Sequence, residues 1–352
     1  MLINIIRILL IPFAFIYGFI IEIRNWFYNL GILNSTKYNV PVISIGNITA
    51  GGTGKTPFTI YLAELLKDSY TKIAVISRGY GRKSKGMQLV SDGQQILLDP
   101  SLAGDEPYLI ASQLPECLVA VSEERNVAFN YLIENYKPDL IILDDAFQHR
   151  LVQRDIDIVL INAKENLQSK LLLPAGNLRE FRHNLKRADM IVQTNMNMPG
   201  NPDIKKLTKY TGNIYSCFSK VNHLVDLEMQ TIGALSDLVD EPVFIFAGIA
   251  YPENFRIALT QKGVLVKGFQ SYADHYDFTL NDLKDLIIRC HENNCRTLLC
   301  TEKDLVKFFG LQDVINALKS SGIRLLGVRL ELEINQREKL LKNILSLLDN
   351  NI

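Results

Sequence analysis

Glycine, lysine and threonine follow a short apolar segment near residue 50 in an order typical of phosphate binding. Residues 42–45 are rich in β-branched side chains and predict a buried strand, and Gly54, Lys55 and Thr56 precede an apolar helical pattern. Such a strand–loop–helix presents backbone N–H groups and the positive end of a helix to a phosphate. The lysine reaches the terminal phosphates of a nucleotide, and the threonine hydroxyl faces Mg²⁺. The predicted ATP-binding residues are Thr49, Ala50, Gly51, Gly52, Thr53, Gly54, Lys55 and Thr56.

The match to the usual phosphate-loop pattern is incomplete at its first position. Thr49 stands where GxxxxGK[ST] has a glycine, although Gly46, Gly51 and Gly52 lie close by and can supply the turn. The alternative is a glycine-rich turn between a strand and a helix that binds no ligand. The Gly-Lys-Thr ending at a predicted helix N-terminus favours nucleotide binding.

Two aspartates end a second apolar segment. Residues 139–145 read DLIILDD, which places Asp144 and Asp145 at the end of a predicted buried strand. An aspartate there, opposite the threonine of a phosphate loop, holds Mg²⁺ or its water shell. The sequence therefore predicts a Mg²⁺ site formed by Thr56, Asp144 and Asp145. No Asn/Thr-Lys-x-Asp motif follows the predicted strand at residues 190–193, which favours ATP over GTP.

An aspartate and a histidine are candidates for acid–base chemistry. Asp105 opens a predicted helix at the edge of a loop, and His275 follows Asp274 in a polar loop after a predicted strand. A carboxylate and a histidine that meet across a cleft can deprotonate a hydroxyl group. Each residue also has a plainer interpretation, because Asp105 can simply complement the helix dipole and His275 can lie in a capped, solvated turn.

Cationic side chains cluster in residues 77–86, which read SRGYGRKSKG and follow another predicted strand. Open α/β sheets bind ligands at the carboxyl ends of their strands, so Arg78 and Tyr80 are candidates for contact with an anionic substrate. Arg125, just after the predicted strand at residues 117–121, is a candidate phosphate contact. The alternative for the basic loop is a solvated segment without a ligand.

Length, charge and cysteine content restrict the class of protein. The chain has 352 residues, 47% of them hydrophobic, with 38 basic and 38 acidic side chains. This length allows two domains with sizeable cores, and the absence of a basic excess argues against a nucleic-acid-binding protein. The five cysteines lack metal-type spacing, so we interpret them as reduced thiols in a cytoplasmic protein.

The alternation of predicted strands and helices indicates an α/β fold with two successive units. A P-loop domain is predicted over residues 31–212 and a second, smaller domain over residues 241–352, each with parallel strands covered on both faces. Short alternating segments between residues 214 and 229 predict two strands. Residues 213–240 are therefore expected to form a two-stranded linker.

The N-terminal end is the most apolar part of the chain. Residues 8–21 carry no charge, but a full membrane span needs roughly 17–25 apolar residues, and Pro12 and Gly18 interrupt the run. No small-residue cleavage site follows, which argues against a signal peptide. The helix is either buried on the sheet or seated in the inner surface of a membrane. We favour a membrane-associated helix over residues 1–30, because a terminal helix has few neighbours to bury all its sides.

Eight motifs taken together resemble one family, the tetraacyldisaccharide 4′-kinases of lipid A biosynthesis. In chain order they are SIGNITAGGTGKTP, SRGYGR, GDEP, LDDAFQHR, LLPAGNLRE, FAGIAYPENF, ADHYDFT and TEKD. They span nearly the whole chain, and the apolar N-terminus fits the same pattern. Thr49 is ordinary for this family, whose phosphate loop is atypical, whereas Ala146 and Asn177 replace a common glycine and a common proline.

The resemblance implies a fold and an activity. The implied fold has two α/β/α sandwich domains, the first P-loop NTPase-like, joined by a two-stranded linker, with an N-terminal helix at the cytoplasmic face of the bacterial inner membrane. The implied reaction moves the γ-phosphate of ATP, with Mg²⁺, to the 4′-hydroxyl of a tetraacylated glucosamine disaccharide 1-phosphate. Carried over by motif, Asp105 is the base supported by His275, and Gln148, Arg179 and Glu180 are active-site or substrate residues.

A P-loop ATPase that acts as a switch, of the metallochaperone type, is the alternative function. Paired aspartates after a Walker-B-type strand occur there too. The apolar N-terminus and the Asp105 and His275 pair favour the kinase, because a switch protein needs neither. A non-enzymatic membrane adaptor fits poorly with an intact Gly-Lys-Thr. The expected partners are the acylated lipid and the membrane surface, with no nucleic acid and no obligate protein partner.

Overall fold

The apolar runs of the sequence form strands that are buried on both faces of a sheet. The structure is a computed structural model that describes residues 2–165, 167, 170–196 and 204–351. Every residue of β1 (Val42–Asn47), β2 (Ile73–Ser77) and β5 (Leu140–Leu143) is buried, as expected for parallel strands covered by helices.

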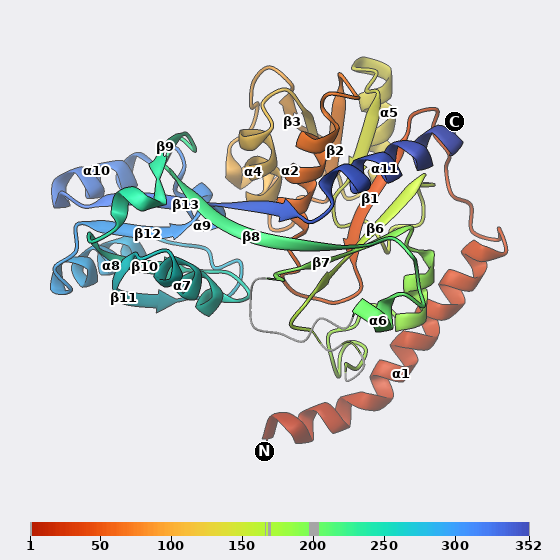
Figure 1. The fold of residues 1–352 in the computed structure, drawn as a ribbon, viewed down its shortest axis with the longest axis horizontal. Coiled ribbons are helices and arrows are strands. Elements are labelled where there is room, and N and C mark those ends of the chain that lie inside the picture. Colours follow the sequence, from red (N-terminus) through yellow and green to blue (C-terminus); the bar gives the residue numbers. More distant parts are fainter. Residues whose placement is uncertain (1, 166, 168–169, 197–203, 352) are drawn as a thin grey trace.

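Two lobes are visible in Figure 1. We define the first lobe as residues 36–213 together with the C-terminal helix α11, and the second lobe as residues 226–323. The other first-lobe strands are β3 (Gln88–Asp92), β4 (Leu118–Val121), β6 (Ile156–Asn162) and β7 (Met190–Thr194). Its helices are α2 (Lys55–Leu66), α3 (Pro100–Ala103), α4 (Asp105–Gln113), α5 (Arg125–Asn135), η2 (Arg182–Arg187), α6 (Ile204–Leu207) and α11 (Arg337–Asn351).

The second lobe repeats the alternation of strands and helices. Its strands are β9 (Thr231–Ala234), β10 (Pro242–Ala247), β11 (Leu265–Ser271) and β12 (Thr297–Thr301). Its helices are η3 (Leu235–Leu238), α7 (Pro252–Gln261), α8 (Leu280–Glu292), α9 (Glu302–Leu305), η4 (Val306–Phe308) and α10 (Gln312–Ser321). The strands β8 (Ile214–Val225) and β13 (Arg324–Ile334) pass between the two lobes.

One continuous sheet runs through both lobes in the order β11-β10-β12-β13-β8-β7-β6-β1-β5-β2-β4-β3, with β9 paired to β8. Neighbouring strands are parallel except for three pairs, β13–β8, β8–β9 and β4–β3, which are antiparallel. The α/β prediction is confirmed, but the sheet is mixed rather than purely parallel. β3 is an antiparallel edge strand that the sequence analysis did not anticipate.

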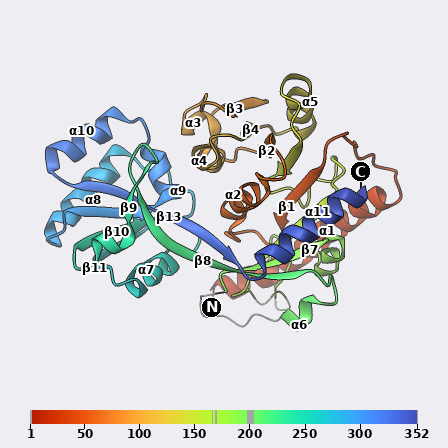
Figure 2. The same ribbon diagram turned by 45° about the horizontal axis from the view of Figure 1, so that its top comes forward.

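Two strands connect the lobes, as expected, but the second of them is not the expected one (Figures 1 and 2). We expected two strands between residues 214 and 229, but β8 is a single strand there. Its antiparallel partner is β13, with Lys220 opposite Glu331 and Cys217 opposite Ile334. The expectation failed because a pairing between segments more than 100 residues apart leaves no local signal in the sequence.

The C-terminal helix also lies elsewhere than expected. We placed all of residues 241–352 in the second domain, but α11 follows β13 back to the first lobe (Figure 1). The Asn343 amide of α11 donates a hydrogen bond to the Tyr215 hydroxyl at 2.7 Å. The domain boundaries at residues 212 and 240 stay a prediction. The positions of β13, which forms part of the connection, and of α11 conflict with assigning residues 241–352 to one domain.

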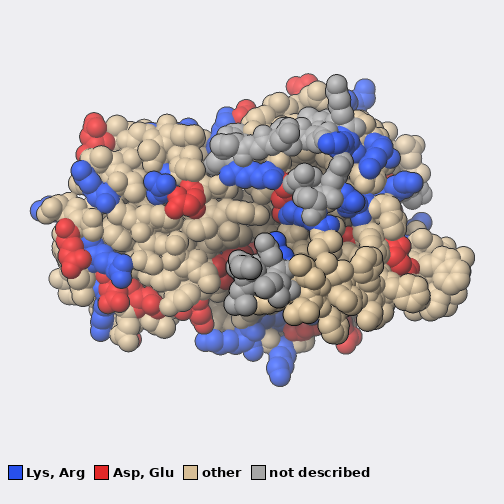
Figure 3. Space-filling model, turned by 90° about the horizontal axis from the view of Figure 1, so that it is seen from below, with Lys and Arg blue, Asp and Glu red and all other residues tan. Residues whose placement is uncertain are grey.

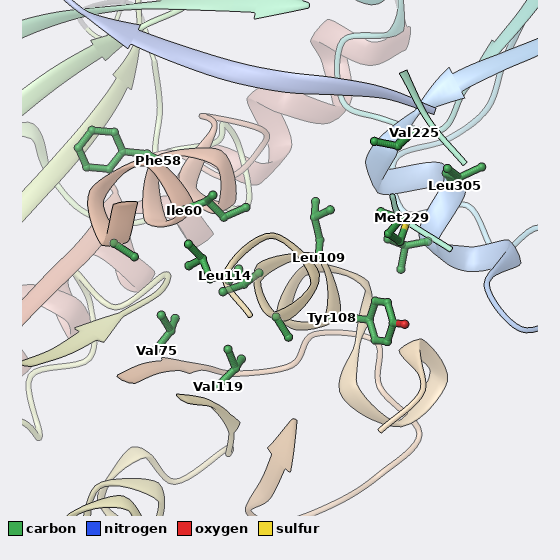
Figure 4. Close-up of a cluster of buried hydrophobic side chains, with 14 of the residues drawn as sticks. Phe58, Ile60, Val75, Tyr108, Leu109, Leu114, Val119, Val225, Met229 and Leu305 are labelled. Atoms are coloured by element: carbon green, nitrogen blue, oxygen red, sulfur yellow. The ribbon is translucent and has the colours of Figure 1, made fainter. Parts of the chain in front are cut away.

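The apolar core extends from the first lobe into the second along helix α4. Tyr108 and Leu109 of α4 belong to the same buried cluster as Val225, Met229 and Leu305 on the second-lobe side (Figure 4). The packing of α4 between the lobes fixes its N-terminus in the space between them. This helix begins at Asp105, one of the predicted catalytic residues.

Helix α1 (Leu2–Asn29) lies along one side of the first lobe. Its inner side packs against residues 172–187: Ala14 is buried, and a Cβ at Gly18 would meet the side chains of Leu172 and Phe181. Its outer side is apolar and exposed. The segment Ile6–Asn29 is long and apolar enough to cross a membrane, and about a tenth of its most apolar stretch is buried. Seen from below, this side of the molecule shows a largely uncharged band with both basic and acidic side chains beside it (Figure 3). The N-terminal helix is confirmed.

The close approach of Phe147 to β1 allows a test of the sheet. A Cβ added to Gly46 would lie 2.6 Å from the Phe147 backbone nitrogen. We expect Gly46→Ala to lower the free energy of unfolding by about 1–3 kcal/mol, because the backbone of the Asp144–Asp145 turn must move. Gly212→Ala, at an exposed site with open space around the glycine, is the matched control. Equal melting temperatures for the two variants would contradict this packing.

Candidate active site

The predicted phosphate-binding loop lies between the end of β1 and the start of α2. Gly54 adopts a left-handed conformation with φ +80°, and α2 begins at the next residue, Lys55. The Thr53 hydroxyl accepts a hydrogen bond from the Asn47 amide at 2.9 Å, and the Thr194 hydroxyl donates to the Thr53 carbonyl at 2.9 Å. The end of β1 and the end of β7 therefore hold the loop in place.

The rest of the loop contacts both lobes. Thr49 is buried and forms an antiparallel bridge with Leu178. Gly52 lies under the second lobe, since a Cβ added to it would come within 3.1 Å of the Ala250 Cβ. Thr56, in the first turn of α2, is buried as well. All of the predicted ATP-binding residues thus form one continuous loop at the junction of the lobes.

The two predicted metal-binding aspartates have different partners. Asp145, whose φ is +49°, pairs with Lys55 at 3.7 Å and with Arg179 at 2.9 Å. Asp144 is fully buried and accepts hydrogen bonds from the Thr59 hydroxyl at 3.1 Å and the Ser77 hydroxyl at 3.2 Å. One carboxylate is therefore neutralised by cations, and the other is held by neutral donors.

This difference separates the acidities of the two groups. Burial disfavours the ionised form of Asp145, but Lys55 and Arg179 outweigh it and hold the pKa of Asp145 below its usual value. Burial, followed by the charges of Glu106 and Asp145, raises the pKa of Asp144 to about 6. Because its pKa is raised, Asp144 is the carboxylate whose ionised form a bound cation would stabilise most.

The residues present fit a Mg²⁺ ion that is completed by a nucleotide. Within the described ranges, no group of three or more His, Cys, Asp or Glu side chains is placed to hold a metal alone. Mg²⁺ characteristically uses one or two carboxylates together with phosphates and water. Asp144, Asp145 and the Thr56 hydroxyl offer that set, although their role as ligands stays a prediction.

Asp105 and His275 come from opposite lobes and face the same space. Asp105 opens α4 and pairs at 3.8 Å with Lys307 of the second lobe. His275, with φ +58°, lies 5.4 Å from the Tyr80 ring between ring centroids and 3.1 Å from the Lys303 Nζ. Lys303 contacts His275 and also pairs at 3.3 Å with Glu106, the neighbour of Asp105, so the two predicted residues lie at the same junction of the lobes.

Burial raises the pKa of the Asp105 carboxyl, and the charges of Lys307, Lys303 and His275 oppose this rise. A raised pKa is expected of a carboxylate that accepts a proton in a site with little water, because it moves the pKa toward the pH at which the enzyme works. The second lobe therefore supplies the cations that face Asp105.

A second group of residues, of which only Arg78 and Arg125 were predicted, surrounds His149 and includes Arg24 of α1. Arg125 is buried, and its Nε has no hydrogen-bond partner among the described residues. The same holds for Arg24 Nε and Nη2 and for His149 Nε2. Burial lowers the pKa of His149 to about 4, and the charges of four arginines add to this effect. The four are Arg125, Arg154, Arg24 and Arg78. Several buried nitrogen atoms of cationic or polar side chains in the described residues thus lack a hydrogen-bond partner, although Asp144, Asp145 and Glu123 act on Arg125 and Asp157 pairs with Arg154.

The remaining predicted residues have mixed surroundings. The Gln148 amide donates to the Asn47 carbonyl at 2.8 Å, and Arg179 binds Asp145, so both lie at the phosphate loop. Glu180 is fully buried, accepts a hydrogen bond from Asn25 of α1 at 2.9 Å and pairs with Arg187 at 3.1 Å. Its carboxylate joins α1 to the first lobe, which favours a structural role over substrate contact.

Sequence reasoning missed several residues of this site. Thr59 and Ser77 hold Asp144, and their distance from it along the chain hides them. His149 was inside a quoted motif but was not singled out. Lys307 follows Lys303 by four residues, a spacing that places both on one side of a helical turn, so it could have been found.

The sequence and the fold are similar to those of known proteins. Residues 6–349 match the family model described as tetraacyldisaccharide-1-P 4′-kinase. The chain belongs to this family. A curated relative from Aquifex aeolicus, named tetraacyldisaccharide 4′-kinase, is 38% identical over 310 residues, covering 88% of this chain and 92% of the relative. A relative of the same name from Chlorobium luteolum is 37% identical over 333 residues, covering 90% and 91%.

A crystal structure of the Aquifex aeolicus family member in complex with ATP has a similar fold. It superposes with a TM-score of 0.80 at 35% identity, covering 97% of this chain and 99% of that one. The family resemblance, the fold class and the assignment as a phosphotransferase with an alcohol acceptor are therefore confirmed. The P-loop switch alternative is not supported.

The low pKa of His149 predicts a pH dependence of stability. The unfolded histidine takes up a proton near pH 6.5, whereas the folded one does so only near pH 4, so the stabilisation present above pH 6.5 is lost as the pH falls toward 4. We expect the melting temperature of the wild type to fall more steeply than that of His149→Gln between pH 7 and pH 4.5. A difference between the two proteins that stays constant with pH would contradict a neutral, buried His149.

Proposed function

We propose that this kinase transfers the γ-phosphate of ATP to the 4′-hydroxyl of a tetraacylated glucosamine disaccharide 1-phosphate at a membrane surface. One observation carries the proposal: the phosphate loop and the Asp105–His275 pair meet between the lobes. The Glu106 carboxylate, next to Asp105, is close enough to Asp144 to raise its pKa. The nucleotide side and the candidate base therefore share one space.

The phosphate donor is positioned by the first lobe. The loop N–H groups and Lys55 cradle the phosphates, and Arg179 keeps Asp145 in place beside Lys55. When bound, Mg²⁺ neutralises the phosphate oxygens and the carboxylates of Asp144 and Asp145. Phosphoryl transfer is mostly positioning and charge neutralisation, so this fixed set of charges is the main contribution of the first lobe.

The acceptor hydroxyl meets Asp105. A sugar hydroxyl has a high pKa, so a carboxylate that accepts its proton as the new P–O bond forms lowers the barrier. His275 packs its ring against Tyr80 of the first lobe and its charge acts on Asp105, so from the second lobe it can support the base only when the lobes are close. Asp105 is thus the base and His275 its supporting residue.

The cationic group near α1 suits the 1-phosphate of the lipid. Arg24, Arg125 and His149 have buried donors without hydrogen-bond partners in the described part of the chain, and an unpaired buried donor costs free energy. A phosphate accepts several such bonds at once. Because Arg24 belongs to α1, this site lies next to the exposed apolar side of that helix, where the acyl chains enter the bilayer.

The decisive assay follows labelled phosphate. The purified protein is incubated with γ-labelled ATP, Mg²⁺ and the acylated disaccharide 1-phosphate in mixed micelles, and the lipids are separated. We expect a labelled lipid with a second phosphate, and Asp105→Asn is expected to lower kcat by about 10²–10⁴ while ATP binding persists. ATP hydrolysis that ignores the lipid would refute the kinase, and an unchanged kcat in Asp105→Asn would remove Asp105 as the base.

Membrane association is tested on the exposed side of α1. Ile16 and Phe19 are more than half exposed, and each contributes about 1.5–3 kcal/mol when it leaves water. We expect Ile16→Glu/Phe19→Glu to lower recovery of the protein with phospholipid vesicles on the order of 100-fold. Ile288→Glu/Leu311→Glu, at two exposed apolar positions of the second lobe (55% and 46% exposed), are the control. Unchanged vesicle binding by the first pair would place the membrane contact elsewhere.

A further inference from the structure

Lys307 is a nearly buried cation whose ammonium group is held by three neighbours. It lies in η4, directly after α9, and its side chain is 6% exposed. The Nζ donates a hydrogen bond to the Tyr276 carbonyl at 2.7 Å and lies 5.3 Å from the centre of the Phe278 ring. It also lies 3.5 Å from Asp304 Oδ1. A lysine with so many partners has little freedom to move.

Asp304 fixes Lys307 to the frame of the second lobe. Asp304 has no exposed surface, and its Oδ2 accepts hydrogen bonds from the Gly248 N–H at 3.0 Å and the Thr301 hydroxyl at 2.6 Å. Only Oδ1 is left to face Lys307. A buried carboxylate needs a counter-charge, so Asp304 and Lys307 hold each other in place between β10 and β12.

From this position Lys307 reaches across to the first lobe. Its Nζ lies 3.8 Å from Asp105 Oδ2. At that distance the two charges attract, but the ammonium group is too far to form a hydrogen bond with the carboxylate, which can therefore still accept one from a substrate hydroxyl. The charged groups that face Asp105 are Lys307 from η4, Lys303 from α9, His275 from the β11–α8 loop and Glu106 from its own helix α4.

Lys303 has a different set of partners. Its Nζ lies 3.3 Å from Glu106, 3.5 Å from Asp274 and 3.1 Å from His275 Nε2, and its side chain is more exposed than that of Lys307. It therefore shares its charge among several groups. Among the described residues, Asp105 is the one first-lobe residue with which Lys307 forms an ion pair. Of the two lysines, Lys307 opposes more strongly the rise that burial causes in the pKa of Asp105.

We propose that Lys307 is a positioning residue for the reaction: its ammonium group keeps the Asp105 carboxylate ionised and fixed between the lobes. This rests on the proposed function of Asp105 as the base. Since Lys307 belongs to the second lobe and Asp105 to the first, the base is ready only when the lobes are as close as they are here. Proton acceptance is thereby tied to the approach of the lobes.

The test is the pH profile of kcat/KM for transfer from ATP to the acylated disaccharide 1-phosphate, with Mg²⁺ present. Without the ammonium group, the effect of burial on the pKa of Asp105 is opposed less. The acid limb of the pH profile of Lys307→Met is therefore expected about one pH unit or more higher than that of the wild type. Activity lost at low pH should return as the pH rises. Lys307→Arg keeps the charge and should retain the wild-type limb. Lys319→Met, an exposed lysine of α10, is the control with unchanged activity.

A second variant covers the possibility that Lys307→Met does not fold. Lys307→Gln removes the charge but keeps an amide donor for the Tyr276 carbonyl, and it should show the same shift of the acid limb. A loss of activity that is equal at all pH values, with the limb unmoved in both variants, would overturn the proposal and leave Lys307 a structural residue. Failure of the wild type to phosphorylate the lipid would instead refute the proposed function itself.

Discussion

Two adjacent aspartates at the end of β5 are held in opposite electrostatic states, and the rest of the site is arranged around them. Asp145 is paired with Lys55 and Arg179, whereas Asp144 is buried against the hydroxyls of Thr59 and Ser77. The first arrangement fixes the lysine of the phosphate loop. The second leaves a carboxylate whose charge is best satisfied by a cation, which is what an incoming nucleotide with its Mg²⁺ provides.

The second constraint is the contact between the lobes. Helix α4 packs its apolar side into a core shared by both lobes, and its first residue is Asp105 (Figure 4). At the other end of the same helix, the Gln113 amide donates to Glu302 at 2.7 Å. Both ends of α4 thus meet α9 and η4. In the proposed reaction, this helix places the base, and the second lobe supplies the cations that keep it ionised.

The sequence predicts the parts of this site whose chemistry is local. The phosphate loop and the aspartates after β5 are recognisable because strand, glycines and charged residues follow one another in the chain. The pairing of β8 with β13 and the return of α11 to the first lobe are not, because they depend on contacts between distant segments. For the same reason the sequence did not reveal that Asp144 and Asp145 differ, since Ser77 and Arg179 come from other strands and loops.

The central claim is that the phosphoryl group passes directly from ATP to a lipid hydroxyl activated by Asp105. A carboxylate between the lobes could instead attack ATP and form a phosphoenzyme. The configuration at phosphorus separates the two routes. With ATP made chiral at the γ-phosphorus by oxygen isotopes, a single in-line transfer predicts inversion in the phosphorylated lipid. Retention of configuration would contradict the account, because it requires two successive displacements.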